Sequence, residues 1–431
     1  MTRARRGLSP ALFLVCLCLA LPAGAAADDP TADPYFGDQW GLQDINAPAA
    51  WQLSTGAGVK VAVVDTGVWA GQEDLAGRVL GGWGFDGSTD DSNDHGTRVA
   101  GVIAAVKGNG KGIAGVAPDA SIVPIRAFDA ASTADGATIL EAVDRAARSG
   151  ARVVNLSFGT KPLSGDEAKT ARRRWRTALA AHPETLYVAA AGNESNDNDV
   201  SPEYPCSVDS PNLICVGAYG QSGARSADSN YGAGTVDLFA PGEQIYTTSK
   251  LGYWADSGTS MAAPFVSGEA ALLFAEVPQL TPGDAIHLIL GTARTVDAFA
   301  AQSASGGRPD ALAALRAATA DGDRDGVYDI FDRCPAQPSS SADGCAVQLP
   351  TPTPSPSPTP LPTPVPPVEP ARDPQRPRLQ RDPPLQLAAA VGDRVPEGED
   401  AESAGLAQRT LKTRVTVLPA PAADDGTAIT R

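Results

Sequence analysis

The feature that most limits the fold of this chain is the regular alternation of two sequence patterns across residues 28–318. Short apolar runs rich in β-branched residues alternate with alanine-rich runs of helical periodicity. The clearest pairs are 59–65 with 96–106, 121–128 with 138–148, and 152–158 with 167–181. Strands and helices that alternate in this way favour a parallel sheet whose faces are covered by helices. The sequence therefore predicts an α/β domain with a mostly parallel central sheet.

The first 27 residues have the order of charge and hydropathy that is typical of a secretory signal peptide. Arg3, Arg5 and Arg6 precede an apolar run at 11–21, and small residues follow at 23–27. The apolar run is shorter than the roughly 20 residues that a helix needs to cross a bilayer. We therefore predict cleavage after Ala27, a secreted or periplasmic mature protein, and no stable membrane insertion.

Cysteine usage agrees with export. Two cysteines lie within the signal peptide, and four remain, Cys206, Cys215, Cys334 and Cys345. An even number of cysteines in an exported chain favours disulfides, and four cysteines allow three pairings. We predict the pairs 206 with 215 and 334 with 345, because each lies within one local segment.

The overall charge excludes some classes of partner. The chain has 34 Lys and Arg against 50 Asp and Glu, a formal net charge of -16. Nucleic acids and anionic membranes are bound through basic surfaces, so neither is an expected partner. A hydrophobic content of 42% excludes a wholly disordered chain. Divalent cations are the expected charged partners.

The sequence after residue 318 has a different character. Residues 319–348 are rich in Asp, and 15 prolines occur between 350 and 384. Dense proline favours an extended spacer, so we assign 349–384 as a Pro/Thr/Ser-rich linker. The polar tail, 385–431, is predicted to be disordered or a minor docking segment.

Three residues capable of acid–base or nucleophilic chemistry stand at predicted element boundaries. Asp65 follows the apolar run 61–64, His95 opens a helical run, and Ser260 precedes an apolar helical run that continues to about residue 276. Taken singly, each has an ordinary explanation as a cap, a turn residue or a packed side chain. Together they supply a nucleophile, a base that accepts its proton, and a carboxylate that orients the base.

Three segments resemble the active-site motifs of the subtilisin-like serine proteases, in particular the thermitase-like branch. They are VAVVDTGV at 61–68, DHGTRVAG at 94–101 and GTSMAAPFVSG at 258–268. The order Asp, His, Ser differs from the orders of chymotrypsin-like and α/β-hydrolase enzymes. The resemblance covers about residues 33–318. It implies a three-layer subtilisin-like fold and an endopeptidase that acts through an acyl-enzyme without a catalytic cofactor.

The resemblance also implies a role for each site residue. Asp65 orients the base, His95 is the general base and acid, and Ser260 is the nucleophile. Asn193, at the end of VAAAGNE, is the oxyanion-hole side chain. The substrate-binding residues are Ser157, Phe158 and Gly159 on a strand edge, and Ala189, Ala190, Ala191 and Gly192 on a wall of the specificity pocket. Pocket walls made of small residues favour a bulky apolar substrate side chain. Glu194 is interpreted either as a contact for basic substrate groups or as a solvated surface residue.

The segment DGDRDGVYDIFD, which begins at Asp321, has the oxygen-ligand spacing of a calcium loop. The predicted ligands are Asp321, Asp323, Asp325, the carbonyl of Val327, Asp329 and Asp332. With Cys334 and Pro335 after it, the segment resembles a thrombospondin type 3 repeat. The alternative is a solvated acidic linker.

A second calcium site is implied only by the resemblance, at Asp74 with Asn109 nearby.

Two functions stay open at this point. The first is a secreted, monomeric endopeptidase that acts on proteins or peptides and binds structural calcium. The second is a non-catalytic binding or scaffold protein on the same fold, although all four catalytic positions hold competent residues.

Overall fold

The computed structural model of the protein describes residues 29–339, 341–345 and 415–417. The predicted signal peptide, the proline-rich linker and most of the polar tail lie outside the described residues. Among the described residues, no helix has both the length and the apolar character needed to cross a membrane.

Seven parallel strands form the central sheet, in the order β2-β3-β1-β5-β7-β8-β9. Their bounds are β1 Lys60–Asp65, β2 Trp83–Gly84, β3 Ser121–Arg126, β5 Val153–Leu156, β7 Leu186–Ala190, β8 Leu213–Tyr219 and β9 Leu238–Pro241. The predicted mostly parallel sheet is confirmed. Parallel strands are buried on both faces, which explains why their sequences are apolar runs rather than strict alternations.

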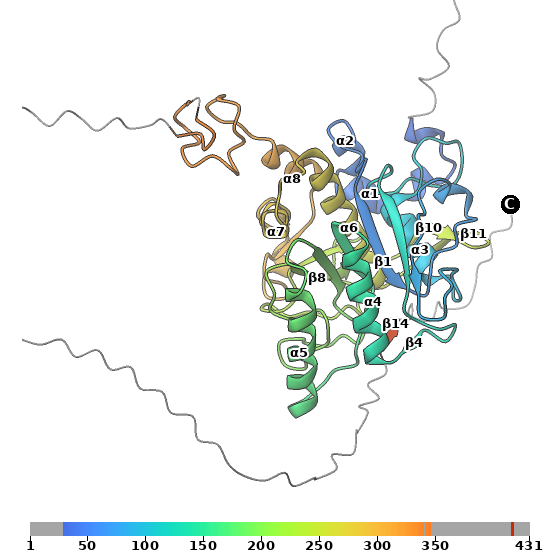
Figure 1. Cartoon of the computed structure of the whole chain (residues 1–431). Coiled ribbons are helices and arrows are strands. Elements are labelled where there is room, and N and C mark those ends of the chain that lie inside the picture. The colour runs from blue at the N-terminus through green and yellow to red at the C-terminus, as the bar shows by residue number, and fades with distance from the viewer. Residues whose placement is uncertain (1–28, 340, 346–414, 418–431) are drawn as a thin grey trace, which may run out of the picture. The chain divides into compact units, whose positions relative to one another are not determined.

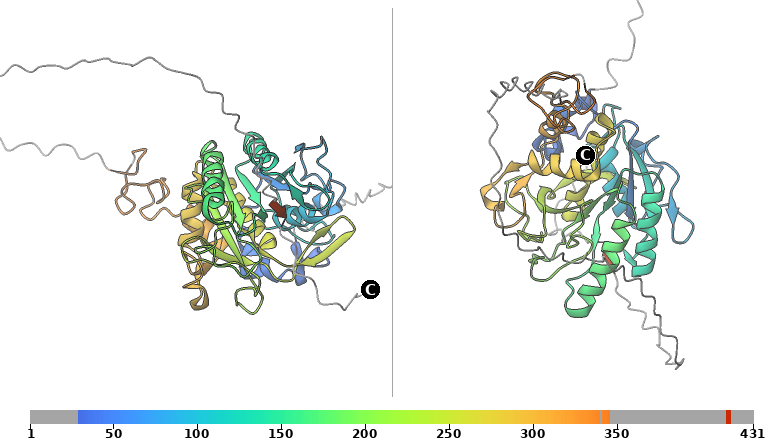
Figure 2. Two further views of the ribbon diagram at one scale, coloured as in Figure 1. Left: turned by 90° about the horizontal axis from the view of Figure 1, so that it is seen from below. Right: turned by 60° about the vertical axis from the view of Figure 1, so that its left-hand side comes forward.

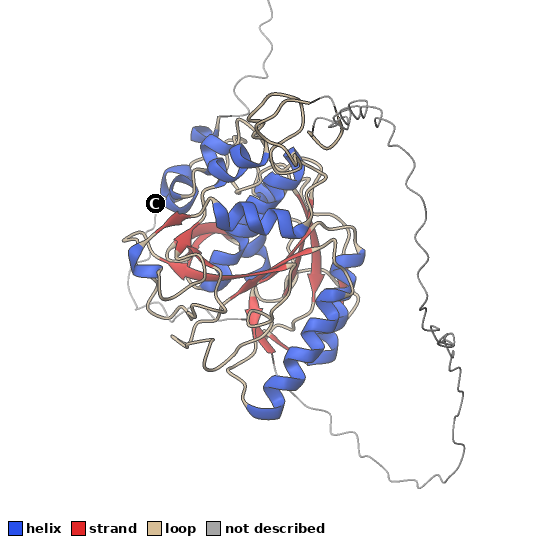
Figure 3. Cartoon of the chain, turned by 90° about the vertical axis from the view of Figure 1, so that its left-hand side faces the viewer, coloured by secondary structure: helices blue, strands red, loops and turns tan. Residues whose placement is uncertain are grey.

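Helices cover both faces of this sheet (Figures 1 and 3). They are α1 Trp40–Asp44, α2 Ala47–Ala50, α3 His95–Ala104, α4 Gly136–Arg148, α5 Gly165–Ala180, α6 Thr259–Glu276, α7 Pro282–Gly291 and α8 Ala311–Ala318. Val61 and Val63 of β1 belong to the core cluster that includes α3 and α6, whereas Ala62 and Val64 belong to the cluster that includes α4 and α5. Successive strand side chains point to opposite faces, so one strand contributes to both layers.

Helix α6 is buried almost along its whole length, which explains its uniformly apolar sequence. It begins after Gly258, whose φ of 132° is a conformation that L side chains rarely adopt. A glycine at this position lets the chain turn sharply into the helix. Ser260 is thereby placed in the first turn of α6.

Short elements complete the described fold. The 3-10 helices are η1 Pro30–Ala32, η2 Phe36–Asp38, η3 Glu73–Leu75 and η4 Asp297–Phe299. Two antiparallel strand pairs are β10 Ile245–Ser249 with β11 Gly252–Asp256, and β12 Arg294–Thr295 with β13 Gly307–Arg308. A separate three-stranded sheet has the order β4-β14-β6, with bounds β4 Thr133–Ala134, β6 Phe158–Gly159 and β14 Val415–Val417. Figures 1 and 2 show β14 as the short red strand. Val415–Val417 of the tail thus pair as a strand with both β4 and β6.

Both predicted disulfides are present. Cys206 and Cys215 are joined with a Cα–Cα distance of 5.0 Å, and Cys334 and Cys345 with one of 5.1 Å. The first cross-links the start of β8 to the loop that precedes it. The second closes the Asp-rich segment.

Candidate active site

The predicted catalytic residues lie at the carboxyl edge of the sheet or at helix N-termini. Asp65 is the last residue of β1, and His95 is the first residue of α3. Asn193 follows β7, and Ser260 is the second residue of α6. Ligands of open parallel sheets bind beyond the carboxyl ends of the strands, so this is the expected place for a site.

Asp65 and His95 form a buried pair. Nδ1 of His95 lies 2.8 Å from Oδ1 and 3.0 Å from Oδ2 of Asp65, and Asp65 is fully buried. Oδ1 of Asp65 also accepts a hydrogen bond of 2.7 Å from the backbone N–H of Thr66. These contacts fix both the carboxylate and the imidazole ring. A ring that donates from Nδ1 carries its lone pair on Nε2.

The Nε2 atom of His95 is the atom available for proton transfer. It is buried, and no group among the described residues hydrogen-bonds to it. Burial by itself lowers the pKa of the ring, but the charge and hydrogen bond of Asp65 oppose this effect, and the net shift is upward. Asp256 and Asp91 contribute in the same direction.

The acidic and basic residues beside His95 pair with each other. Asp94 accepts from Nε and Nη2 of Arg98 at 3.2 and 3.0 Å. Nη1 of Arg98 also donates to Asp256 at 2.9 Å. Because Asp256 ends β11 just before Gly258, this ion pair ties the histidine helix to the segment that leads into Ser260.

Asn193 and Ser157 hold the start of α6. Oδ1 of Asn193 accepts from the backbone N–H and the hydroxyl of Thr259, both at 2.9 Å. The hydroxyl of Ser157 donates to the carbonyl of Ser260 at 2.8 Å. The first N–H groups of a helix have no intrahelical acceptor. The N–H of Ser260 is one of these groups, and the side chain of Asn193, from the loop after β7, contacts the same helix start through Thr259.

A carboxylate that the sequence does not mark, Glu203, lies near the predicted walls of the specificity pocket. Its side chain is 1% exposed, and Oε1 accepts from Nδ2 of Asn230 at 2.8 Å. Oε2 is buried and has no hydrogen-bond partner among the described residues. A Cβ placed on Gly192 would lie 2.5 Å from Oε2, and one on Gly159 would lie 3.7 Å from it. Glu203 thus lies between the two predicted walls of the pocket.

Burial raises the pKa of Glu203 to about 9, and the negative charge of Glu194 acts in the same direction. The carboxyl group is therefore protonated and neutral at pH 7. Glu194 itself is exposed, and its Oε2 accepts from the backbone N–H of Asn193 at 2.7 Å. No pattern in the sequence marks Glu203, because it lies in an irregular loop before Cys206 and reaches the pocket only through tertiary folding.

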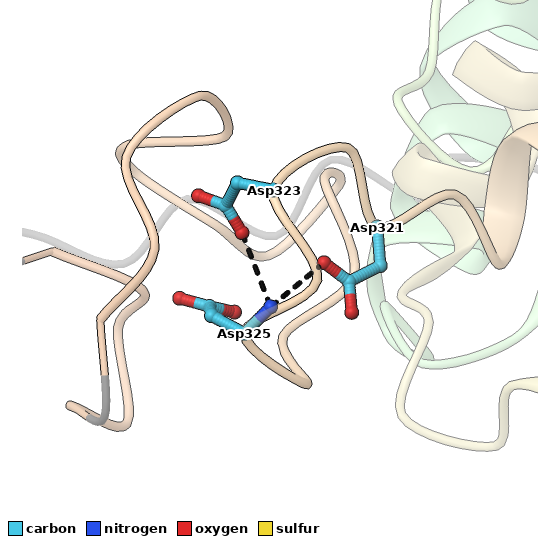
Figure 4. Close-up of side chains that lie close together, drawn as sticks. All are labelled: Asp321, Asp323 and Asp325. Atoms are coloured by element: carbon cyan, nitrogen blue, oxygen red, sulfur yellow. Dashed lines mark hydrogen bonds between the residues drawn. The ribbon is translucent and has the colours of Figure 1, made fainter.

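The Asp-rich loop brings its first three acidic residues together (Figure 4). Asp321, Asp323 and Asp325 offer carboxylate oxygens that all lie within 4.8 Å of one another. The backbone N–H of Asp325 donates to Oδ1 of both Asp321 and Asp323 at 3.2 Å. Oδ2 of Asp323 and Oδ2 of Asp332 are buried without hydrogen-bond partners. Carboxylate oxygens that cluster in this way and lack hydrogen-bond donors suit a hard cation such as Ca²⁺.

Asp74 has a different environment. Its two oxygens accept from Nδ2 of Asn109 and from the backbone N–H of Ile113, both at 2.7 Å. Burial, with smaller contributions from Asp33 and Glu73, raises the pKa of Asp74 to about 7. Through these hydrogen bonds Asp74 holds the loop that follows α3, to which Asn109 and Ile113 belong. Metal binding at Asp74 stays a prediction.

A parallel sheet covered on both faces, with these groups at its carboxyl edge, defines an α/β enzyme fold. Residues 56–318 match the model of the Subtilase family. Thermitase of Thermoactinomyces vulgaris is 41% identical over 246 residues, which cover 56% of this chain and 84% of that protein. Subtilisin Savinase of Lederbergia lenta is 38% identical over 239 residues, which cover 54% of this chain and 83% of that protein.

The fold agrees with a solved relative. A protease from Pseudoalteromonas arctica PAMC 21717 superposes with a TM-score of 0.58 at 30% identity, covering 67% of this chain and 99% of that one. The chain belongs to the subtilase family, and it is a serine endopeptidase.

Proposed function

We propose that the chain hydrolyses peptide bonds through an Asp65–His95–Ser260 triad and an acyl-enzyme. The observation that carries the proposal is the buried Asp65–His95 pair, whose Nε2 has no partner among the described residues. His95 accepts the proton of the Ser260 hydroxyl as that oxygen attacks the substrate carbonyl, and later returns it to the leaving amine. Asp65 holds the tautomer and stabilises the imidazolium. Water then hydrolyses the ester with His95 again as the base.

A direct test is labelling by a fluorophosphonate probe, which reacts with activated serines. We expect one labelled peptide, containing Ser260, and parallel hydrolysis of fluorescent casein by the same preparation. A folded protein that neither reacts nor cleaves would favour the second reading, a binding or scaffold protein on a subtilase fold.

The oxyanion of the tetrahedral intermediate is stabilised in this proposal by the Asn193 amide and the N–H of Ser260. Replacing Asn193 by Ala should lower kcat by about 10²- to 10³-fold, because a donor aimed at the developing charge is lost. Replacing it by Asp retains an acceptor for Thr259 but places a carboxylate near the oxyanion. We expect steady-state kinetics to show at least as large a loss for Asn193→Asp, with KM little changed in both variants.

We propose broad specificity with a preference for bulky apolar side chains at neutral pH. Ala189, Ala190 and Ala191 give the pocket small apolar walls, and the protonated Glu203 adds no charge. Above a pH of about 9 the Glu203 carboxyl ionises, which disfavours an apolar side chain and favours a cationic one. The specificity is thus expected to depend on pH.

This dependence is measurable with paired peptides that carry Phe or Arg before the scissile bond. The ratio of kcat/KM for Arg over Phe should rise at least about tenfold between pH 7 and pH 10, because an ion pair forms in a poorly solvated pocket. Glu203→Gln should give a flat ratio. Glu194→Gln should move the rise to lower pH, since the charge that raises the Glu203 pKa is removed. A rise that persists in Glu203→Gln would contradict the assignment.

We propose that the Asp-rich loop is a structural calcium site of the thrombospondin type 3 kind. Asp321, Asp323 and Asp325 would supply carboxylate oxygens, and Val327, Asp329 and Asp332 would complete the shell. Calorimetric titration of calcium should show at least a tenfold weaker affinity for Asp325→Asn, because one charged ligand is lost. Asp343→Asn makes the same charge change outside the predicted ligand set and should leave the affinity unchanged. Equal titrations of the two variants would argue for a merely acidic segment.

The chain is proposed to act after export, as a monomer, on protein or peptide substrates. The predicted signal peptide at 1–27 and the two disulfides support export, because disulfides persist in oxidising compartments. The acidic net charge supports the exclusion of nucleic acids as partners.

A further inference from the structure

Strand β14 comes from the far end of the chain and lies between two edges of the peptidase domain. The order of the small sheet is β4-β14-β6, so the tail strand pairs with a domain strand on each side. Val415 faces Ala134, and Thr416 faces both Thr133 and Gly159. Val417 faces Phe158. The predicted substrate-binding edge, Phe158–Gly159, is thus covered by residues of the same chain.

The direction of β14 is that of a chain approaching the nucleophile. It runs antiparallel to β6, from Gly159 towards Phe158. The residue before Phe158 is Ser157, whose hydroxyl donates to the carbonyl of Ser260. The C-terminal end of β14 is therefore the end directed along β6 towards the proposed active site.

Both edges are fixed by the domain itself. Phe158 is fully buried and packs against the rings of Phe128 and Trp175 at centroid distances of 5.1 and 6.2 Å. Thr133 of β4 donates from its N–H and its hydroxyl to Asp129, both at 2.9 Å. Because these edges are already ordered, adding a strand between them costs mainly the conformational entropy of the added segment.

The sequence of the tail suits this position. Val-Thr-Val is β-branched throughout and uncharged, whereas residues 392–404 and 422–426 are rich in acidic residues and glycine. A strand added to an exposed edge gains main-chain hydrogen bonds on each side with little demand on its sequence.

The tether strengthens a weak contact. About 70 residues separate Cys345 from Val415, and tethering within one chain over such a length gives an effective concentration on the order of 1 mM or more. A segment with an intrinsic Kd of about 0.1 mM would then occupy the space between β4 and β6 about nine-tenths of the time.

We propose that Val415–Val417 is a tethered, substrate-like occupant of the space between β4 and β6, here called the cleft, and that it competes with protein substrates for this space. The inference rests on the proposed function of this cleft. It assigns the tail the role of an intramolecular competitive inhibitor. Release of the tail, by a competing substrate or by cleavage in the linker, exposes the cleft.

The first test compares the full-length protein with Thr416→Pro. Proline at 416 removes the central N–H of β14 and cannot form its ladder hydrogen bond. For a short chromogenic peptide we expect an apparent KM about tenfold lower and an unchanged kcat. Thr427→Pro makes the same substitution in the same tail outside β14, and it should behave as the unmodified protein. Equal KM values for all three proteins would overturn the inference while leaving the endopeptidase activity intact.

The second test measures binding without catalysis. A fluorescent peptide of residues 412–420 is titrated against full-length protein carrying Ser260→Ala and Thr416→Pro, in which the cleft is open and inert. Saturable binding is expected, and a peptide with proline at the position of Thr416 should not bind. Full-length Ser260→Ala with its own tail intact should bind the fluorescent peptide about tenfold more weakly. Absence of binding to the open protein would reject the docking site even if the enzyme proved inactive.

Discussion

Ser260→Ala should lower kcat by about 10⁶-fold, the size of loss reported for removal of the serine nucleophile of subtilisin, a relative of this chain. The hydroxyl is the only group of the side chain that can form the acyl-enzyme, so no partial substitute exists within the residue. A small residual hydrolysis is expected from the oxyanion donors and from substrate positioning. The measurement is single-turnover and steady-state hydrolysis of a chromogenic peptide.

The control for this variant is structural integrity. Ser260 is 2% exposed in the first turn of α6, and its carbonyl still accepts from Ser157 after the substitution. The thermal unfolding midpoint should therefore change little. A variant that stays folded and keeps more than about a hundredth of the activity would show that Ser260 is not the nucleophile.

Asp65→Asn should lower kcat by about 10⁴-fold, because the amide favours the wrong tautomer of the histidine. In the unmodified protein Asp65 helps to hold the His95 pKa above its ordinary value, and the base acts only when it is neutral. Activity should therefore rise with pH through this raised pKa. In Asp65→Asn the opposing effect of burial persists without the carboxylate charge, so the pKa falls.

The acid limb of the profile of kcat/KM against pH should accordingly move to lower pH in Asp65→Asn, while the plateau falls. A variant damaged only in its folding would lose activity at every pH without moving the limb. An unmoved limb in a folded variant would contradict the role of Asp65 as the charged partner of His95. Arg98→Gln is a second comparison, because it breaks the pairs with Asp94 and Asp256 but keeps the Asp65 charge, so the acid limb should not move to lower pH.

The sheet and its helices were predictable because each leaves a local pattern. Buried parallel strands give apolar runs such as 61–64, and amphipathic helices such as α4 repeat at 3.6 residues. The helix predicted over 138–148 is α4, Gly136–Arg148, and that over 167–181 is α5, Gly165–Ala180. The disulfides were predictable because each closes a short loop.

The sequence by itself determined the fold class, the family and the identity of the candidate triad, since these are carried by contiguous motifs at element boundaries. Only the tertiary structure decided what surrounds the motifs. Asp94 pairs with Arg98, Glu203 approaches Gly192 from an irregular loop, and Val415–Val417 lies against β6 from more than 250 positions away. These contacts depend on the spatial approach of distant backbone segments, and no local periodicity or spacing encodes such an approach.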